Sequence, residues 1–300
     1  MDDIKNFEVD NKIPGKDITD EDLKSKFPLA AKKYDGHKTT IKVGDIEIGG
    51  DELIIFAGPN TVENRDMIIE TAKEVKKRGA HFLRAGAYKP LTFPYRSNSY
   101  FELREKGVEY LKEAKELTGI KVITEIMHIE KIEEISSVSD ILQVGTRNMQ
   151  NYPLLEALGK QKKPVMLKRH YGASLRDWLG AAEYILYNGN PNVILCERGV
   201  SVTHTHRSTS RFLLDLQVIP AARDFTHLPI ISDPSHATFW ADWVPSMCYA
   251  SVGSGVDGVM IEVHPDPRNA ATDPLQPIGF EEFSNVFTKM KKIHNIIKNK

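Results

Sequence analysis

The sequence has little cysteine, no long hydrophobic run and almost no net charge, and each of these features excludes a class of protein. Two cysteines in 300 residues, Cys196 and Cys248, cannot form a disulfide framework, so a reducing, cytoplasmic location is expected. No apolar run reaches the roughly 18–20 residues that span a bilayer, and the acidic, polar first ten residues do not resemble a signal peptide. With 40 basic against 41 acidic residues, the net charge of −1 argues against a protein that binds nucleic acid. We therefore expect neither a membrane nor a nucleic-acid partner.

The first fifty residues differ from the rest of the chain. Residues 1–35 are charged, contain Pro14 and Pro28, and are interpreted as an N-terminal arm. Residues 38–50 alternate apolar and polar side chains on both sides of Gly44 and Asp45, a pattern typical of a β-hairpin. The predicted organisation is an arm and hairpin over residues 1–50, followed by a catalytic barrel over residues 51–300. The hairpin is expected to cap the closed end of the barrel or to join a subunit interface.

Eight short, β-branched apolar runs follow, separated by segments with helical spacing. Two of these segments, 67–79 and 107–119, end on glycine, as helices commonly do. Nearly continuous apolar strands that alternate with helices predict an α/β protein, and eight such units in about 250 residues predict a (β/α)₈ TIM barrel. A doubly wound open sheet is the rival fold, but no G-x-G-x-x-G follows the first run. The runs are 53–58, 82–87, 121–126, 140–145, 164–169, 192–197, 229–234 and 258–263.

Ionisable residues lie at or just after the ends of these runs, where a barrel of this kind has its active site. Arg84, Glu125 and Glu262 interrupt apolar runs, and a charge in such a place must be paired or must serve a ligand. Six cations are expected to converge on one mouth and to hold a small polyanionic substrate. The alternative is that strand ends simply meet water. The six cations are Arg84, Lys89, Arg147, Lys168, Arg169 and Arg198.

A second group could bind a metal ion. His236, Glu262 and Asp273 are reasonable ligands for Mn²⁺, Fe²⁺ or Zn²⁺. The alternative is that Asp233 and Glu262 merely neutralise the cations. The spacing of these residues leaves both interpretations open.

Several segments in this order resemble the type I 3-deoxy-D-arabino-heptulosonate 7-phosphate (DAHP) synthases. That family is related to the 3-deoxy-D-manno-octulosonate 8-phosphate (KDO8P) synthases, and the resemblance covers about residues 36–285. The matching segments are AGPNTVE (57–63), LRAGAYKP (83–90), DILQVGTRNMQN (140–151), KPVMLKR (163–169), GNPNVILCERG (189–199), THLPIISDPSHAT (226–238) and GVDGVMIEVHPDP (255–267).

The resemblance implies an oligomeric transferase, a dimer or tetramer, built on a (β/α)₈ barrel. Such enzymes condense phosphoenolpyruvate (PEP) with erythrose 4-phosphate, giving DAHP, a 3-deoxy-2-ulosonate, and phosphate. This reaction opens the shikimate pathway towards the aromatic amino acids. The resemblance also implies catalytic roles for Lys89 as a general acid, for Glu125 in positioning water, and for His236 and Asn60. It implies that PEP is bound by Arg84, Lys89, Arg147, Lys168 and Arg198.

The family's metal ligands map onto this chain with one exchange. The ligands are a Cys, a His, a Glu and an Asp, and they correspond to Asn60, His236, Glu262 and Asp273. A neutral carboxamide is a poor ligand for a soft divalent ion, and metal-independent KDO8P synthases carry the same exchange. We therefore expect that no cofactor is required, or that a divalent metal binds only weakly.

Three further departures fall where the aldehyde acceptor is expected. Leu91 replaces an arginine that, in the family, helps to bind the acceptor's phosphate. The segment 168–174 places His170 and Tyr171 near the mouth. The loop 200–211 is about three residues longer than in the family. The expected acceptor-binding residues are Pro90, Leu91, Thr92, Asp233, Arg207 and Arg211.

Three functions remain open at this point. Arg207, Arg211 or Arg96 could replace the lost guanidinium, and the enzyme would then make DAHP. A paralogue of secondary metabolism would instead use a different aldehyde, unphosphorylated acceptors included. A catalytically weakened barrel would only bind a metabolite. Residues 1–35 are shorter than the regulatory domain of some relatives, so feedback inhibition through such a domain is not expected.

Overall fold

Eight parallel strands close into a barrel. The computed structural model describes residues 21, 24–89, 102–203, 206 and 212–298. The eight predicted apolar runs are confirmed, and the closing contact between β12 and β3 excludes an open sheet. The barrel strands are β3 (Ile54–Gly58), β4 (Phe82–Arg84), β5 (Lys121–Glu125), β6 (Ile141–Val144), β7 (Val165–Lys168), β8 (Val193–Glu197), β11 (Ile230–Ser232) and β12 (Gly258–Glu262).

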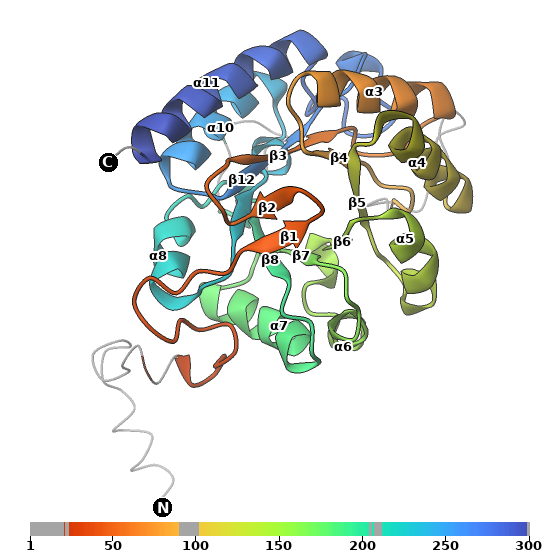
Figure 1. Ribbon diagram of the computed structural model, residues 1–300. Helices are drawn as coiled ribbons and strands as arrows, with labels where there is room; N and C mark the ends of the chain where they lie inside the picture. Colours follow the sequence, from red (N-terminus) through yellow and green to blue (C-terminus); the bar gives the residue numbers. More distant parts are fainter. Residues whose placement is uncertain (1–20, 22–23, 90–101, 204–205, 207–211, 299–300) are drawn as a thin grey trace, which may run out of the picture.

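Helices surround the barrel, with at least one helix after each strand (Figure 1). The segments 67–79 and 107–119 are helical, as predicted. The Asn64 side chain caps α3 by accepting from the amide of Met67, and α4 ends at Gly119 in the left-handed conformation. The helices are α3 (Arg65–Lys77), α4 (Glu105–Thr118), α5 (Ile132–Val138), α6 (Tyr152–Gly159), α7 (Leu175–Tyr187), α8 (Val218–Phe225), α9 (Pro234–Thr238), α10 (Val244–Gly253) and α11 (Phe280–Lys298).

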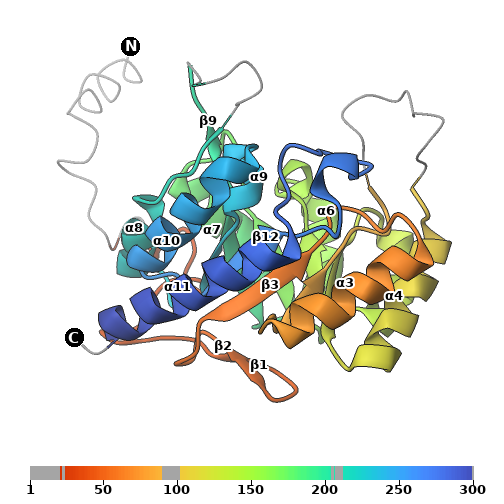
Figure 2. The same ribbon diagram turned by 90° about the horizontal axis from the view of Figure 1, so that it is seen from above.

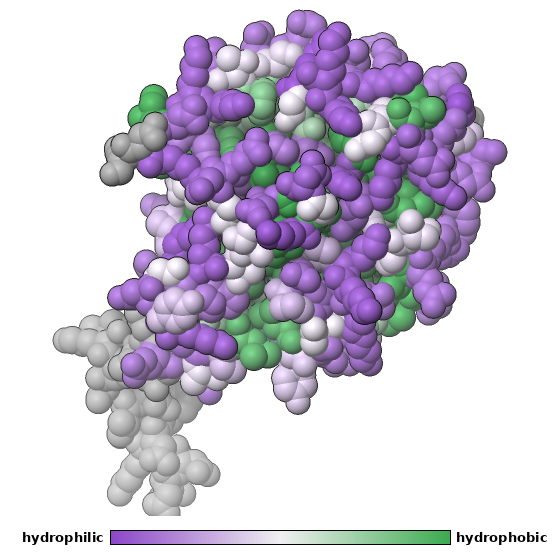
Figure 3. Space-filling model, in the orientation of Figure 1, coloured by the Kyte–Doolittle hydropathy of each residue, from purple (hydrophilic) through white to green (hydrophobic). Residues whose placement is uncertain are grey.

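The hairpin predicted at 38–50 forms a plug for the barrel interior. Strands β1 (Ile41–Val43) and β2 (Ile46–Ile48) pair antiparallel, and their apolar side chains join the same core cluster as the inward side chains of the barrel. Phe56 and Phe82 stack within this cluster, with ring centroids 4.7 Å apart. The hairpin lies across the centre of the ring of helices (Figure 1), and the surface on that side is largely hydrophilic (Figure 3). The prediction that the hairpin caps the closed end of the barrel is therefore confirmed.

The end opposite the hairpin carries the loops that follow the strands. Figure 2 shows β9 (Val200–Ser201) at one edge of the molecule and the hairpin β1–β2 at the other edge. Strand β9 pairs with β10 (Phe212–Leu213). In the part of the chain that the structure describes, no helix is both long and apolar enough to cross a membrane. The boundary between the arm and the barrel at residue 50 stays a prediction.

Candidate active site

The polar strand ends meet in one cavity of about 380 Å³ at the carboxyl end of the barrel. The position agrees with the general placement of active sites in this fold. Eight of the predicted site residues line it: Asn60, Arg84, Lys89, Glu125, Arg147, Lys168, Arg198 and His236. The predicted acceptor residues Pro90, Leu91, Thr92, Arg207 and Arg211 lie outside the described residues, as does Arg96.

Asp233 contacts two of the cavity residues, Lys168 and His236. Its fully buried carboxylate accepts from Lys168 Nζ at 2.5 Å and lies 2.9 Å from His236 Nδ1. Burial acts to raise the pKa of Asp233, but the charges of His236 and Lys168 outweigh it and hold that pKa well below its ordinary value. Burial lowers the pKa of His236 well below its ordinary value, against the opposing charge of Asp233. Asp233, predicted as an acceptor contact, therefore acts in this structure as the support of Lys168 and His236.

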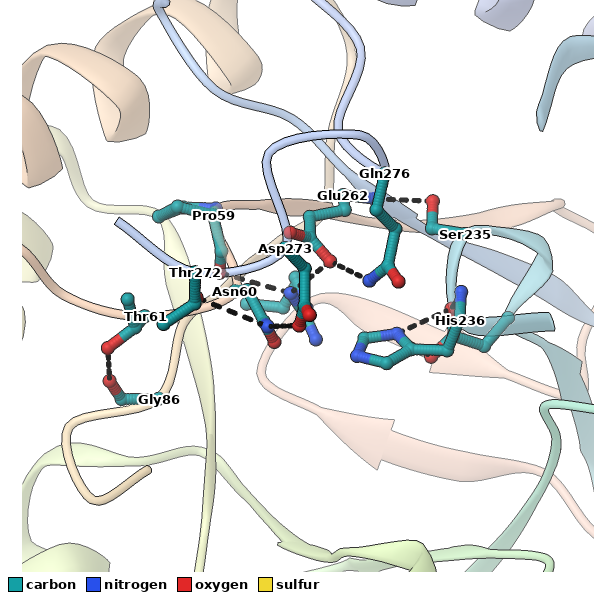
Figure 4. Close-up of polar contacts among 12 residues, drawn as sticks. Pro59, Asn60, Thr61, Gly86, Ser235, His236, Glu262, Thr272, Asp273 and Gln276 are labelled. Carbon is teal, nitrogen blue, oxygen red and sulfur yellow. Dashed lines mark hydrogen bonds and ion pairs between the residues drawn. The ribbon is translucent and has the colours of Figure 1, made fainter. Parts of the chain in front are cut away.

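Asn60 links Lys89 to Asp273, as Figure 4 shows for the amide and the carboxylate. Its Nδ2 donates to Asp273 Oδ2 at 2.7 Å, and its Oδ1 accepts from Lys89 Nζ at 2.8 Å. A carboxylate only accepts and an ammonium only donates, so the two neighbours together fix the orientation of the amide. Burial lowers the pKa of Lys89, which makes its proton easier to transfer.

Glu262 lies beside Arg84 at the end of β12. The two side chains approach to 3.8 Å, and Gln276 donates to the Glu262 carboxylate (Figure 4). Burial raises the pKa of Glu262 to about 7, against the opposing charge of Arg84. Arg84 also donates to the carbonyl of Pro59 at 3.1 Å. Arg84 is therefore held on two sides before any ligand binds.

The four residues that align with the family's metal ligands do not fit a resident divalent metal as they are arranged. They are Asn60, His236, Glu262 and Asp273. The only ligating atom of Asn60 already faces the ammonium of Lys89, and a bound cation there would have to displace that ammonium. Asp273 Oδ2 in turn accepts from Asn60 Nδ2. Across the described ranges, no three His, Cys, Asp or Glu side chains gather in a way that could hold a metal ion.

Glu125 sits against a glycine at the neighbouring strand end. A Cβ added to Gly145 would lie 1.9 Å from Glu125 Oε1 and 2.7 Å from Cδ. Any side chain at position 145 would therefore push the carboxylate out of its place in the cavity wall. The glycine creates the space that Glu125 occupies.

One of the six predicted cations lies elsewhere. Arg169 does not line the cavity, because successive side chains near a strand end point to opposite faces and Lys168 takes the inward direction. Its Nη1 donates instead to Glu197 Oε2 at 3.0 Å and to Asp215 Oδ2 at 2.8 Å. The prediction that Arg169 belongs to the mouth is wrong.

The structure adds residues that the sequence reasoning missed. Gln143 lines the cavity from within the apolar run of β6. A polar residue inside an apolar strand is the same signal that identified Arg84 and Glu125, so Gln143 could have been found. Gln276 and Phe212 carry no such signal, because both lie on segments between the predicted barrel elements.

Comparisons with known proteins agree with the fold. Residues 26–299 match the model of the DAHP synthetase I family. A phospho-2-dehydro-3-deoxyheptonate aldolase of Thermotoga maritima is 40% identical over 267 residues, which are 89% of this chain and 77% of that protein. A 2-dehydro-3-deoxyphosphooctonate aldolase of Syntrophobacter fumaroxidans is 26% identical over 84% of this chain and 91% of its own length.

Two solved structures have the same fold. The crystal structure of the Thermotoga maritima phospho-2-dehydro-3-deoxyheptonate aldolase (DAHP synthase) superposes with a TM-score of 0.82 at 38% identity, over 90% of this chain and 76% of that one. A truncated form of 3-deoxy-D-arabino-heptulosonate 7-phosphate synthase from the same organism gives a TM-score of 0.81 at 37% identity. The superposition covers 91% of this chain and 98% of that chain. With a family match over most of its length and the predicted barrel confirmed, this chain belongs to the DAHP synthetase I family.

Proposed function

We propose that this protein condenses PEP with an aldose phosphate, erythrose 4-phosphate as the default, to give a 3-deoxy-2-ulosonate and inorganic phosphate. The observation that carries the proposal is the convergence of five cations on one cavity at the carboxyl end of the barrel. PEP carries a phosphate and a carboxylate on three carbons, and such a compact polyanion needs a dense group of positive charges. The cations are Arg84, Lys89, Arg147, Lys168 and Arg198.

The chemistry of carbon–carbon bond formation fits Lys89. As C3 of PEP attacks the aldehyde carbon, negative charge develops on the aldehyde oxygen and must receive a proton. Lys89 can donate that proton, because its ammonium is buried, has a lowered pKa, and is aimed by Asn60 Oδ1. Asn60 in turn is oriented by Asp273. Lys89 and Asn60 together then determine where the developing oxyanion lies.

Glu125 fits the second half of the reaction. Water adds at C2 of the PEP-derived carbons, and the C–O bond to phosphate breaks as inorganic phosphate leaves. Glu125 reaches the cavity wall over Gly145, in a position to orient that water and take its proton. Lys168 also lines the cavity, and its ammonium can balance the charge of the departing phosphate.

We propose further that no resident metal is needed. The support is the arrangement of Asn60, because its Oδ1 accepts from Lys89 Nζ and its Nδ2 donates to Asp273, so the ammonium takes the ligating atom that a metal would need. The hydrogen-bond donors of this chain thereby supply the positive charge.

The central experiment supplies PEP and compares acceptors. Purified protein is incubated with PEP and either erythrose 4-phosphate or erythrose, and both phosphate release and 3-deoxy-2-ulosonate formation are measured. We expect turnover with erythrose 4-phosphate. Faster turnover of an unphosphorylated aldose would favour the paralogue of secondary metabolism, for which the replacement of arginine by Leu91 is the supporting observation. Absence of PEP-dependent phosphate release with every aldehyde would leave only a metabolite-binding barrel.

A matched pair of lysine variants tests the chemistry. Lys89→Met should lower kcat by about 10²–10⁴-fold, the usual contribution of a general acid. Lys73→Met removes the same charge from an exposed position on α3 and should leave turnover unchanged. Equal rates in the two variants would contradict the role proposed for Lys89.

A further inference from the structure

The connection after β8 carries an aromatic side chain into the wall of the cavity. Strands β9 and β10 form a short hairpin in this connection, at the end of the barrel opposite β1–β2 (Figure 2). Phe212 on β10 and Ser201 on β9 both line the cavity. The resemblance to the family assigns no role to either residue.

Phe212 contacts one of the proposed PEP-binding cations. Its ring lies under the guanidinium of Arg198, with Cζ 4.3 Å from the ring centroid. A guanidinium over the face of an aromatic ring is attracted by the ring's electrons, and the attraction is larger where water is excluded. Arg198 is only 8% exposed, and its Nη2 also donates to the carbonyl of His236 at 3.2 Å. The ring and the carbonyl together restrict the plane of the guanidinium.

The backbone around Phe212 allows this close approach. Gly199 has φ +99°, and a Cβ there would lie 2.9 Å from Phe212 Cβ. Phe212 pairs with Ser201, whose amide donates to the carbonyl of Tyr171 at 2.8 Å. The centroids of the Tyr171 and Phe212 rings lie 5.6 Å apart, so the two rings pack against each other.

An ion cluster around the buried Glu197 fixes both ends of this connection. Glu197 Oε1 accepts from the amide of Gly199 at 2.7 Å and from that of Asp215 at 3.3 Å. Arg169 Nη1 bridges the Glu197 and Asp215 carboxylates. Glu197 is fully buried, and the proposed reaction does not use it. The cluster holds the chain on either side of the hairpin and so fixes the position of β10.

We propose that Phe212 is a positioning residue that orients the Arg198 guanidinium towards PEP, with the Arg169–Glu197–Asp215 cluster holding Phe212 in place. The inference rests on the proposed PEP-binding role of Arg198. An arginine whose plane is fixed in advance loses less side-chain entropy when it binds an anion. The effect therefore belongs to the binding of PEP and leaves the bond-making steps unchanged.

Three substitutions at Phe212 separate orientation from simple packing. Phe212→Leu keeps apolar bulk but removes the ring face, Phe212→Tyr keeps the face, and Phe212→Ala removes both. The control is Leu213→Ala, at the next residue of β10, whose side chain is 51% exposed. We expect the Leu and Ala variants to raise the KM for PEP about tenfold, with kcat and the KM for the acceptor unchanged. The Tyr variant and the Leu213 control should stay within about twofold of the wild type.

The outcomes distinguish the inference from the function on which it rests. An unchanged KM for PEP in Phe212→Leu, in a protein that turns over PEP, would overturn the positioning role alone. A fall in kcat shared by Phe212→Leu and Leu213→Ala would also overturn it, because it would indicate general damage to the hairpin. If the wild type neither binds PEP in calorimetry nor releases phosphate from it, the proposed function itself fails and the inference fails with it. Circular dichroism of each variant confirms that folded protein is compared.

Discussion

At the scale of single residues, the site is defined by which atom each side chain turns to its neighbour. Asn60 shows this most clearly. The sequence establishes only that a carboxamide replaces the family's thiolate, whereas the structure shows its oxygen facing Lys89 and its amide nitrogen facing Asp273. Each contact matches a donor with an acceptor, so the arrangement is stable without a cation at its centre.

The first prediction concerns metal removal. Dialysis against a chelator should leave the activity of the wild type unchanged, and added Mn²⁺ should change it by less than about twofold, because the Asn60 oxygen is already bonded to Lys89 and a carboxamide is a poor ligand for a soft ion. Asn60→Cys restores a thiolate and removes the partner of Lys89. We expect this variant to lose activity on chelation and to regain it with Mn²⁺. Loss of wild-type activity on chelation, with recovery on Mn²⁺, would contradict the proposal.

The second prediction concerns Glu125 and the glycine beneath it. Gly145→Ala places a methyl group where the Glu125 carboxylate now lies, so the carboxylate must move by an ångström or more. We expect kcat to fall by about 100-fold, the usual effect of misplacing a catalytic group by that distance. Gly180→Ala is the matched control, since a Cβ at that site on α7 meets nothing within 4 Å. Equal kcat values in the two variants would show that the position of Glu125 does not matter.

At the scale of elements, the apolar runs specified the barrel more completely than the site. A parallel strand covered on both faces must be apolar along its length, so all eight strands were visible in the sequence. Polar residues inside those runs, such as Arg84 and Glu125, were equally visible. The direction of Arg169 follows from the same alternation, because Met166 and Lys168 point inward and Arg169 therefore points to the other face. Phe212 and Gln276 could not be predicted, since their contacts arise from loops that only the closed barrel brings together.

The third prediction concerns the hairpin β1–β2 as a plug. Ile48 is fully buried and belongs to the core cluster of the barrel interior. Ile48→Ala should lower the free energy of unfolding by about 2–5 kcal/mol, because it removes buried methyl groups and leaves a cavity. Lys42→Ala, on the exposed face of the same hairpin, should change it by less than about 0.5 kcal/mol. Denaturant unfolding measures both values.

The kinetics of the same variants provide a second test of the plug. The hairpin lies at the end of the barrel away from the cavity, so folded Ile48→Ala should keep the wild-type KM for PEP (Figure 2). A changed KM with unchanged stability would mean that the hairpin contributes to the site and not to the core.

At the scale of the whole molecule, a net charge of −1 conceals an uneven distribution. Five cations from four strand ends share one cavity, and the carboxylates that balance two of them, Asp233 and Glu262, are buried. Like charges held this close repel one another in water-poor surroundings. A dianionic ligand relieves that repulsion and connects strands on different sides of the barrel, so its binding should stabilise the whole fold.

The last prediction follows from this charge distribution. PEP at about 100 times its dissociation constant should raise the free energy of unfolding by about 2.7 kcal/mol, and the melting temperature of a chain of this length by about 4 °C. Sodium chloride at the same ionic strength should give a much smaller rise, since screening acts on the repulsion but forms no bridge between strands. Arg147→Gln removes one of the cavity cations, and should reduce the rise with PEP. An equal rise with chloride and with PEP, or an unchanged response to PEP in Arg147→Gln, would show that the cavity does not bind PEP through these charges.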